Sequence, residues 1–243
     1  MMIELTSTPI IIMVILGVAG MIIPVINVIR KERGSSTFYG LIAFGALLLS
    51  LGYVIYRFYT DSVADAAIFS SDVLVDDGFG SFFAIAMLIV SIMAVAGSFN
   101  YMRKRSNPAI YFSLILLSSI GMVLIAFSTD LVMLFVAWEL MSIPTYILAG
   151  YNKKDPSSNE AAIKYFLFGA LSSGIIIYGI SLAYGITGST NIGDVIYGFS
   201  NLSPDMLPLG LLAIGMFIAG FGFKMGLVPF HMWLPDTYEG SPP

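Results

Sequence analysis

The chain has 243 residues, of which 58% are hydrophobic and only 11% are charged, and its formal net charge is −4. Together with a mean hydropathy of +0.90, this composition excludes an ordinary water-soluble globular domain and indicates a membrane protein without a nucleic-acid partner. The sequence contains no cysteine and one histidine, which excludes disulfides, thiolate nucleophiles, iron–sulfur ligation and a His/Cys metal site within it.

Seven apolar runs are long enough to cross a hydrocarbon core about 30 Å thick. They lie at residues 9–29, 37–58, 79–100, 109–128, 131–151, 159–185 and 207–228. We therefore predict an all-α, polytopic membrane protein with about seven transmembrane helices. The first run is too long for the apolar core of a signal peptide and lacks a basic start, so we expect it to remain as an anchor.

Basic residues concentrate in alternate loops between these runs. They are Arg30, Lys31, Arg33, Arg103, Lys104, Arg105, Lys153 and Lys154. We expect the chain to lie in the plasma membrane. By the positive-inside rule, these basic loops then face the cytoplasm, and the N-terminus lies outside. Acidic segments 60–78 and 188–206 then lie on the outer side.

Neither acidic segment resembles a separate domain. The Asp-Gly pair in 60–78 predicts a small outer loop or hairpin, and the Gly, Asn and Pro residues of 188–206 predict a segment along the outer face. We expect one transmembrane domain over 1–243, with peripheral spans in 1–130 and the chemically active spans in 131–243.

Glu139 is the one carboxylate within the fifth run, eight residues after its start and hence about 12 Å along a helix. A charge near the bilayer midplane costs on the order of 3 kcal/mol unless it is neutralised, paired or hydrated. The alternative is a protonated acid that hydrogen-bonds a neighbouring helix. Pro144 leaves the Leu140 carbonyl without its helical partner. We expect Ser142 and Thr145 to satisfy such groups or to hold a water.

Lys164 lies near the cytoplasmic end of the sixth run. One interpretation is a lysine that snorkels to the headgroups. The small residues of GALSSG, 169–174, instead suit close helix packing, which predicts that this face of the helix contacts other helices rather than lipid. A lysine on a packed face needs a counter-ion, and Glu139 is the nearest candidate because a short loop joins the two helices.

The end of the seventh run and the residues that follow it contain several unusual residues for a span. They are Lys224, Gly226, Pro229, His231 and Pro235. Two prolines and a glycine exclude a straight helix, so backbone groups here must meet protein or water at membrane depth. Lys224 either snorkels or sits in this broken region. His231 is either a satisfied interfacial residue or a proton relay, since histidine changes charge near neutral pH.

The predicted membrane interior thus holds one acid, two lysines and a histidine, on three different spans. Burial disfavours every charged form, whereas pairing Glu139 with a lysine favours both charges. These opposed effects create a switch. When the pair separates, Lys224 can release a proton and Glu139 can accept one without a metal or a covalent intermediate.

Three stretches in this order carry a family resemblance. They are AWELMSIPTYIL from Ala137, EAAIKYFLFGALSSGIIIYGISLAYGITGSTNI from Glu160, and FGFKMGLVPFHMWLPDTYEGSP from Phe221. They resemble the antiporter-like subunits of respiratory complex I, with the second stretch most similar to subunit N, and relatives in multi-subunit sodium/proton antiporters and membrane-bound hydrogenases. The match is strong over 138–243, whereas 1–130 match mainly in span pattern and in VDDGFGSFF.

The resemblance implies a proton-translocating, non-redox subunit of an NADH- or other donor-quinone oxidoreductase. In it, Glu139 and Lys224 form the central pair, Lys164 modulates the pair, and Pro144 and Pro229 support the breaks near them. Quinone, flavin and iron–sulfur clusters are expected in partner subunits of the membrane arm and beyond it, with no cofactor on this chain.

The family fold has about fourteen spans, including two inverted five-helix bundles. The present sequence corresponds to the first inverted half, with its last span broken. We expect a fragment or a split subunit that another chain or segment completes, and we expect that this chain alone does not transport. The alternatives are a subunit of a cation/proton antiporter or hydrogenase, and a non-conducting structural subunit.

Overall fold

The computed structural model describes residues 7–30, 35–61, 73–103 and 105–242. All regular elements in these ranges are helices. They are α1 (Thr8–Ile29), α2 (Ser36–Asp61), α3 (Gly78–Met102), α4 (Pro108–Phe127), α5 (Leu131–Ala149), α6 (Pro156–Thr187), α7 (Ile192–Ser200), α8 (Leu207–Met225) and α9 (Leu234–Gly240). Within the described residues, seven of these helices are long and apolar enough to cross a membrane. The predicted fold class, with its broken last span, is confirmed.

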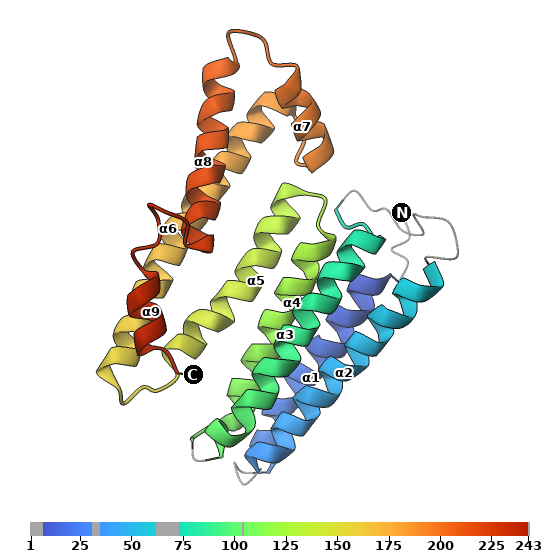
Figure 1. The fold of residues 1–243 in the computed structure, drawn as a ribbon, viewed down its shortest axis with the longest axis vertical. Coiled ribbons are helices and arrows are strands. Elements are labelled where there is room, and N and C mark those ends of the chain that lie inside the picture. The colour runs from blue at the N-terminus through green and yellow to red at the C-terminus, as the bar shows by residue number, and fades with distance from the viewer. Residues whose placement is uncertain (1–6, 31–34, 62–72, 104, 243) are drawn as a thin grey trace. The chain divides into compact units, whose positions relative to one another are not determined.

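The chain divides into two compact units, residues 1–128 and 129–243. In the first unit, α1 to α4 lie side by side (Figure 1), and α4 packs against the other three. Its fully buried side chains include Leu16, Tyr39, Leu88 and Phe112. Hydroxyls also join these helices, since Ser119 donates to Ser91 over 2.9 Å. This unit is a scaffold of apolar packing with polar contacts between helices, as is usual in membranes.

The Asp-Gly pair predicted to turn a hairpin instead begins a helix. Asp77 caps α3 by accepting the N–H of Gly80 at 2.7 Å. Before it, Leu74 forms a single antiparallel bridge with Ser128. Most of the predicted outer loop, residues 62–72, lies outside the described residues. Within 73–78, a helix cap takes the place of the expected turn, because the Asp side chain satisfies an N–H that the first helical turn leaves unpaired.

Helix α6 is the centre of the second unit, and α5, α7, α8 and α9 all contact it. Figure 1 shows α8 running along α6, with α9 beside the beginning of α6 and α7 near its end. Helix α7 falls in the predicted outer segment 188–206 and was not expected. Asn191 caps it by accepting the N–H groups of Gly193 and Asp194, so the Asn that suggested a loop is in fact a start signal.

A second cap fixes the beginning of α5. Asp130 accepts two backbone N–H groups of the first turn at 2.8 and 2.9 Å, and its other oxygen accepts the hydroxyl of Thr190. The N–H of Leu131 also donates to the Thr190 carbonyl over 2.8 Å. The link between α6 and α7 therefore holds the start of the helix that carries Glu139.

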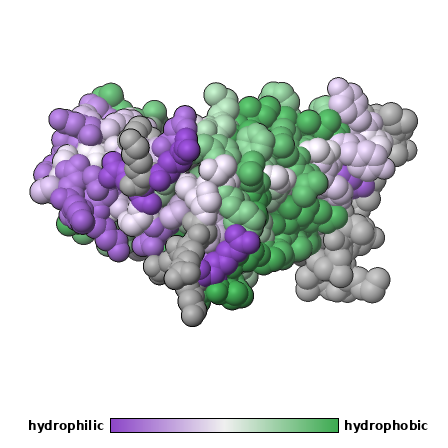
Figure 2. Space-filling model, turned by 90° about the horizontal axis from the view of Figure 1, so that it is seen from below, coloured by the Kyte–Doolittle hydropathy of each residue, from purple (hydrophilic) through white to green (hydrophobic). Residues whose placement is uncertain are grey.

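The surface carries many large apolar side chains. Figure 2 shows them gathered over a broad area, apart from the areas where hydrophilic side chains gather. Met21, Leu49, Met93 and Ile218 are each more than 60% exposed although they lie within candidate spans. An apolar surface of this extent suits lipid or a neighbouring subunit rather than water.

Candidate functional site

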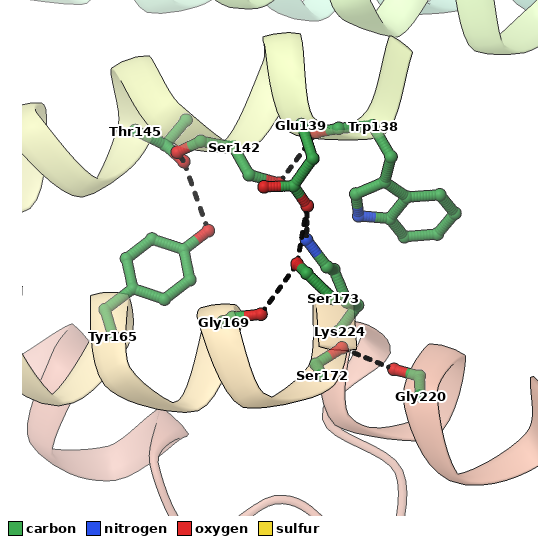
Figure 3. Close-up of polar contacts among 10 residues, drawn as sticks. All are labelled: Trp138, Glu139, Ser142, Thr145, Tyr165, Gly169, Ser172, Ser173, Gly220 and Lys224. Carbon is green, nitrogen blue, oxygen red and sulfur yellow. Dashed lines mark hydrogen bonds and ion pairs between the residues drawn. The ribbon is translucent and has the colours of Figure 1, made fainter. Parts of the chain in front are cut away.

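Glu139 and Lys224 form an ion pair in the second unit. Glu139 lies in the middle of α5 and Lys224 in the last turn of α8, and the Lys224 ammonium nitrogen (Nζ) lies 2.5 Å from Oε1 of Glu139. The Lys224 side chain is 4% exposed and that of Glu139 is 23% exposed. Figure 3 shows the two side chains pointing toward one another. The structure thus brings together the two residues that the sequence placed in the central pair.

A third helix contributes to the same carboxylate. Ser173 of α6 lies with its hydroxyl 2.6 Å from Oε1 of Glu139, the atom that Lys224 also contacts (Figure 3). A buried charge is costly unless it is both paired and hydrogen-bonded. Three helices therefore meet at one oxygen atom, where they supply an opposite charge and a hydrogen-bond donor.

Two glycines allow this close approach. A Cβ on Gly169 would overlap the hydroxyl end of Tyr146 from α5, and a Cβ on Gly220 would overlap Ile176 of α6. Beside that contact, the Ser172 hydroxyl donates to the Gly220 carbonyl over 2.7 Å. Helix α6 is thus held close to α5 and to α8 on both sides of Ser173, in agreement with the packing predicted for its small residues.

The hydroxyls around Pro144 do not bond the carbonyl that they were expected to satisfy. Ser142 donates to the Trp138 carbonyl at 2.8 Å, and Thr145 donates to the Ser142 carbonyl at 2.7 Å. Neither hydroxyl bonds Leu140, because each reaches back three or four residues from its own position. Helix α5 nevertheless continues through Pro144 without a break.

Helix α8 ends at Met225, one residue after Lys224. Gly226 takes a left-handed conformation, φ +66°, which favours glycine. The Phe223 carbonyl, freed at this helix end, accepts the N–H of Gly226 at 3.2 Å and the indole N–H of Trp233 at 2.9 Å. The predicted break is confirmed, and it places the Lys224 cation in the last turn, where the helix dipole favours positive charge.

A small cavity of about 30 Å³ lies beside Lys224. Residues from α5, α6, α8 and the segment before α9 line it, among them Ser142, Tyr146, Tyr165, Ser172, Lys224 and Trp233. This volume exceeds what one water molecule needs. The lining is mostly apolar and aromatic, but Lys224 and the serine and tyrosine hydroxyls in it offer hydrogen-bond partners. The arrangement can accommodate water next to the lysine ammonium.

Tyr165 and Trp233 were not predicted as site residues. The Tyr165 ring stacks on that of Trp233, with centroids 4.9 Å apart and planes 6° apart. Its hydroxyl lies 3.2 Å from that of Thr145. Because the one Thr145 proton goes to the Ser142 carbonyl, Tyr165 is the donor in this contact. A sequence signal existed for Tyr165 alone, since it directly follows Lys164 in the IKYF motif.

The expected pairing of Lys164 with Glu139 is wrong. Lys164 contacts Glu160 one turn earlier on α6 and Asp236 on α9, each at 2.6 Å. Its side chain is 36% exposed, so within this chain it does not lie on a fully packed helix face. Asp236 can pair with Lys164 because α9, which the sequence did not predict, packs against the beginning of α6.

His231 lies apart from the ion pair. It is exposed in the segment between α8 and α9, together with Pro229, and it is not among the residues that line the cavity. Among the described residues, no three His, Asp or Glu side chains gather in a way that could hold a metal. The contact of Glu139 with Lys224 joins a carboxylate and an amine, two groups that can each hold or release a proton.

Comparison with known proteins gives matches over both units. Residues 128–243 match the family described as NADH:quinone oxidoreductase/Mrp antiporter, transmembrane. NADH-quinone oxidoreductase subunit N of Desulfitobacterium hafniense is 40% identical over 230 residues, which cover 94% of this chain and 45% of that protein. F(420)H(2) dehydrogenase subunit N of Methanosarcina mazei is 40% identical over 172 residues, covering 71% and 34%.

Two solved structures share the fold. One chain of respiratory complex I from Thermus thermophilus, solved with bound aureothin, matches with a TM-score of 0.76 and 29% identity, over 95% of this chain and 48% of that one. A chain of an archaeal membrane-bound sulfane sulfur reductase matches with a TM-score of 0.82 and 22% identity, over 96% and 48%. The chain spans about half the length of the relatives that it matches.

Proposed function

The chain belongs, through residues 128–243, to the NADH:quinone oxidoreductase/Mrp antiporter transmembrane family, and we propose that it is a proton-translocating membrane-arm subunit of a complex I-like oxidoreductase. The observation that carries this proposal is the ion pair of Glu139 and Lys224, which lies within two candidate spans. An intramembrane ion pair is costly to maintain, and such residues commonly mark ion and proton pathways.

The pair moves protons by opening and closing. While Lys224 contacts Glu139, each charge stabilises the other. When the contact opens, Glu139 and Lys224 are both left desolvated and without a counter-charge. The neutral form of each side chain is then lower in free energy than the charged form. Lys224 then releases a proton toward the adjacent cavity, and Glu139 accepts one. Closing the pair reverses both changes, so any charge movement in the assembly that opens the pair drives a proton step.

Lys164 acts on this pair from a distance. It lies nine residues before Ser173 on α6, which corresponds to about 14 Å along the helix. At that separation a unit charge changes the energy of another by on the order of 1 kcal/mol for an effective dielectric constant of about 20. Lys164 therefore modulates the pair rather than joining it. We assign His231 to proton exchange at the exposed turn after α8.

Electron transfer takes place in partner subunits under this proposal. The printed names of the relatives include an NADH-quinone oxidoreductase and an F(420)H(2) dehydrogenase, which differ in electron donor. We place flavin, iron–sulfur clusters and quinone in other subunits, and we place the second helix bundle of the family fold in a further segment or chain. The subunit sits in the plasma membrane with its basic loops toward the cytoplasm.

A cation/proton antiporter is the second candidate, because the matching family description includes Mrp antiporters. The two assignments use the same pair with different partners. Purifying the complex through a tag on this chain separates them. Co-purified quinone-linked dehydrogenase subunits support the oxidoreductase, whereas their absence together with sodium-dependent proton exchange rejects it.

The proposed function is tested by Glu139→Gln in the assembled complex. Inverted membrane vesicles are supplied with electron donor and quinone, and proton uptake is measured per electron transferred. We expect the ratio to fall well below the wild-type value. Glu160→Gln is the matched control, because Glu160 is exposed and contacts only the modulating Lys164. An unchanged ratio in Glu139→Gln, with the subunit assembled, would contradict the proposal.

A further inference from the structure

We propose that Ser173 is a positioning residue whose hydroxyl turns between two acceptors as Glu139 gains and loses its proton. The inference rests on the proposed function, since it assigns a role within the same site. Ser173 is 8% exposed and projects from α6 toward the Glu139 carboxylate (Figure 3). It touches the proton-accepting oxygen directly, which Lys164 and His231 do not.

Two acceptors compete for one proton. The Ser173 oxygen lies 2.6 Å from Oε1 of Glu139 and 2.8 Å from the Gly169 carbonyl oxygen. A serine hydroxyl donates one hydrogen bond, so only one of these contacts can be made at a time. Both oxygens are within normal reach, and rotation about the Cβ–O bond exchanges them without any movement of the backbone.

The charge of Glu139 determines which of the two acceptors receives the hydrogen bond from the Ser173 hydroxyl. A hydrogen bond to a carboxylate is about twice as strong as one to a neutral carbonyl, so ionised Glu139 holds the Ser173 proton and stays oriented toward Lys224. Once Glu139 is protonated, Oε1 is a weaker acceptor and the hydroxyl turns to Gly169. In both states the buried hydroxyl keeps a partner, which removes the penalty that an unsatisfied polar group would add to the proton step.

The neighbouring serine provides a matched control. Ser172 is also buried on α6, but its hydroxyl donates to the Gly220 carbonyl of α8, and no contact joins it to Glu139 in the described structure. Removing either hydroxyl deletes one hydrogen bond of a buried serine on the same helix. Only the Ser173 change removes a donor from the carboxylate.

The test is an infrared pH titration of the assembled complex in membranes. The carbonyl band of protonated Glu139 is identified by its loss in Glu139→Gln. In Ser173→Ala we expect the midpoint of this band to move upward by about one pH unit, because the ionised form has lost a charge-assisted hydrogen bond. Ser173→Thr, which retains a hydroxyl, is expected to restore the wild-type midpoint, and Ser172→Ala is expected to leave it unchanged.

Three outcomes overturn the inference. These are an unchanged midpoint in Ser173→Ala, an equal shift in Ser172→Ala, or no recovery in Ser173→Thr. Should Ser173→Ala fail to assemble, Ser173→Cys keeps nearly the same volume with a weak donor, and a midpoint equal to that of wild type then overturns it. Failure of the proposed function is recognised separately, by normal proton uptake in Glu139→Gln.

Discussion

The two members of the ion pair differ in how far this chain encloses them. Lys224 is almost fully covered, whereas nearly a quarter of the Glu139 side chain is exposed. Lys224 lines the cavity together with Tyr165 and Trp233, and Glu139 is not among the residues that line it. Under the proposed function, we expect protons to reach the two groups by different routes.

The two lysines are expected to differ in importance. We predict that Lys224→Ala abolishes most proton uptake, because it leaves Glu139 without its counter-charge, whereas Lys164→Ala retains the larger part. Lys164 is more exposed and acts only at long range. The measurement is proton uptake per electron in vesicles.

Asp236→Asn serves as the control, because it removes one acid partner of Lys164 and leaves the central pair intact. We expect Asp236→Asn, like Lys164→Ala, to retain the larger part of proton uptake. A greater loss in Lys164→Ala than in Lys224→Ala would contradict this assignment.

The pair of Glu139 and Lys224 was predicted through the family resemblance of the stretches around them. The charges alone indicated that Glu139 needs an opposite charge within the membrane, and they pointed first to Lys164. The same reasoning failed for Lys164, since its partner Asp236 lies 72 residues away on a short helix. Ser173 could not be identified, because a serine hydroxyl bonds many kinds of acceptor and the choice depends on how the helices pack. Tyr165 follows Lys164 in the IKYF motif, but its contact with Thr145 depends on the same packing.

Among the helices, α6 sets the position of the site. It contacts α5 at Gly169 and α8 at Gly220, so the separation between Glu139 and Lys224 depends on how closely α6 approaches both. The α5 cap at Asp130 and the left-handed Gly226 at the end of α8 fix where the two flanking helices begin and end. Together these contacts hold the two charged residues at the level of Ser173.

A glycine substitution tests this role of α6. We predict that Gly220→Ala destabilises the second unit by about 1–3 kcal/mol through overpacking against α6. It should also lower proton uptake, because Lys224 lies one helical turn further along α8. Thermal unfolding in detergent and proton uptake are the measurements.

Gly215→Ala is the matched control on the same helix, where a Cβ meets no atom within 4 Å. We expect it to be neutral or stabilising, because alanine favours the helix by about 1 kcal/mol over glycine. Equal effects of the two substitutions would show that the contact at Gly220 is unimportant.

The elements were predicted unevenly. All seven spans were found within a few residues of their ends, because about 20 apolar residues in a row are an unambiguous signal. Helices α7 and α9 have nine and seven residues and begin among Gly, Asn and Pro, so composition favoured loops there. Their helical form depends on an Asn cap and on packing against α6, neither of which is visible in hydropathy.

At the scale of the whole molecule, the positive-inside rule predicts a direction for each span from the basic loops. Helix α6 has 32 residues and is about 48 Å long, so it is longer than a hydrocarbon core is thick. The loop with Lys153 and Lys154 precedes it and α7 follows it. Ser173 lies between these two ends of α6.

This orientation can be measured with single cysteines, because the chain contains none. We predict that a membrane-impermeant maleimide labels Lys153→Cys only from the cytoplasmic side and Ser200→Cys only from the outer side. Both positions are exposed. Labelling of both cysteines from one side would contradict the topology, and the parent chain without cysteine supplies the background.

The central claim is that Glu139 and Lys224 work as one proton-exchanging unit. It is tested most directly by measuring proton uptake per electron in Glu139→Gln, Lys224→Met and the double variant, with assembly checked by co-purification. The account predicts that all three fall to the same reduced ratio, since either substitution already removes the pair. A double variant that assembles and takes up protons at the wild-type ratio would contradict it.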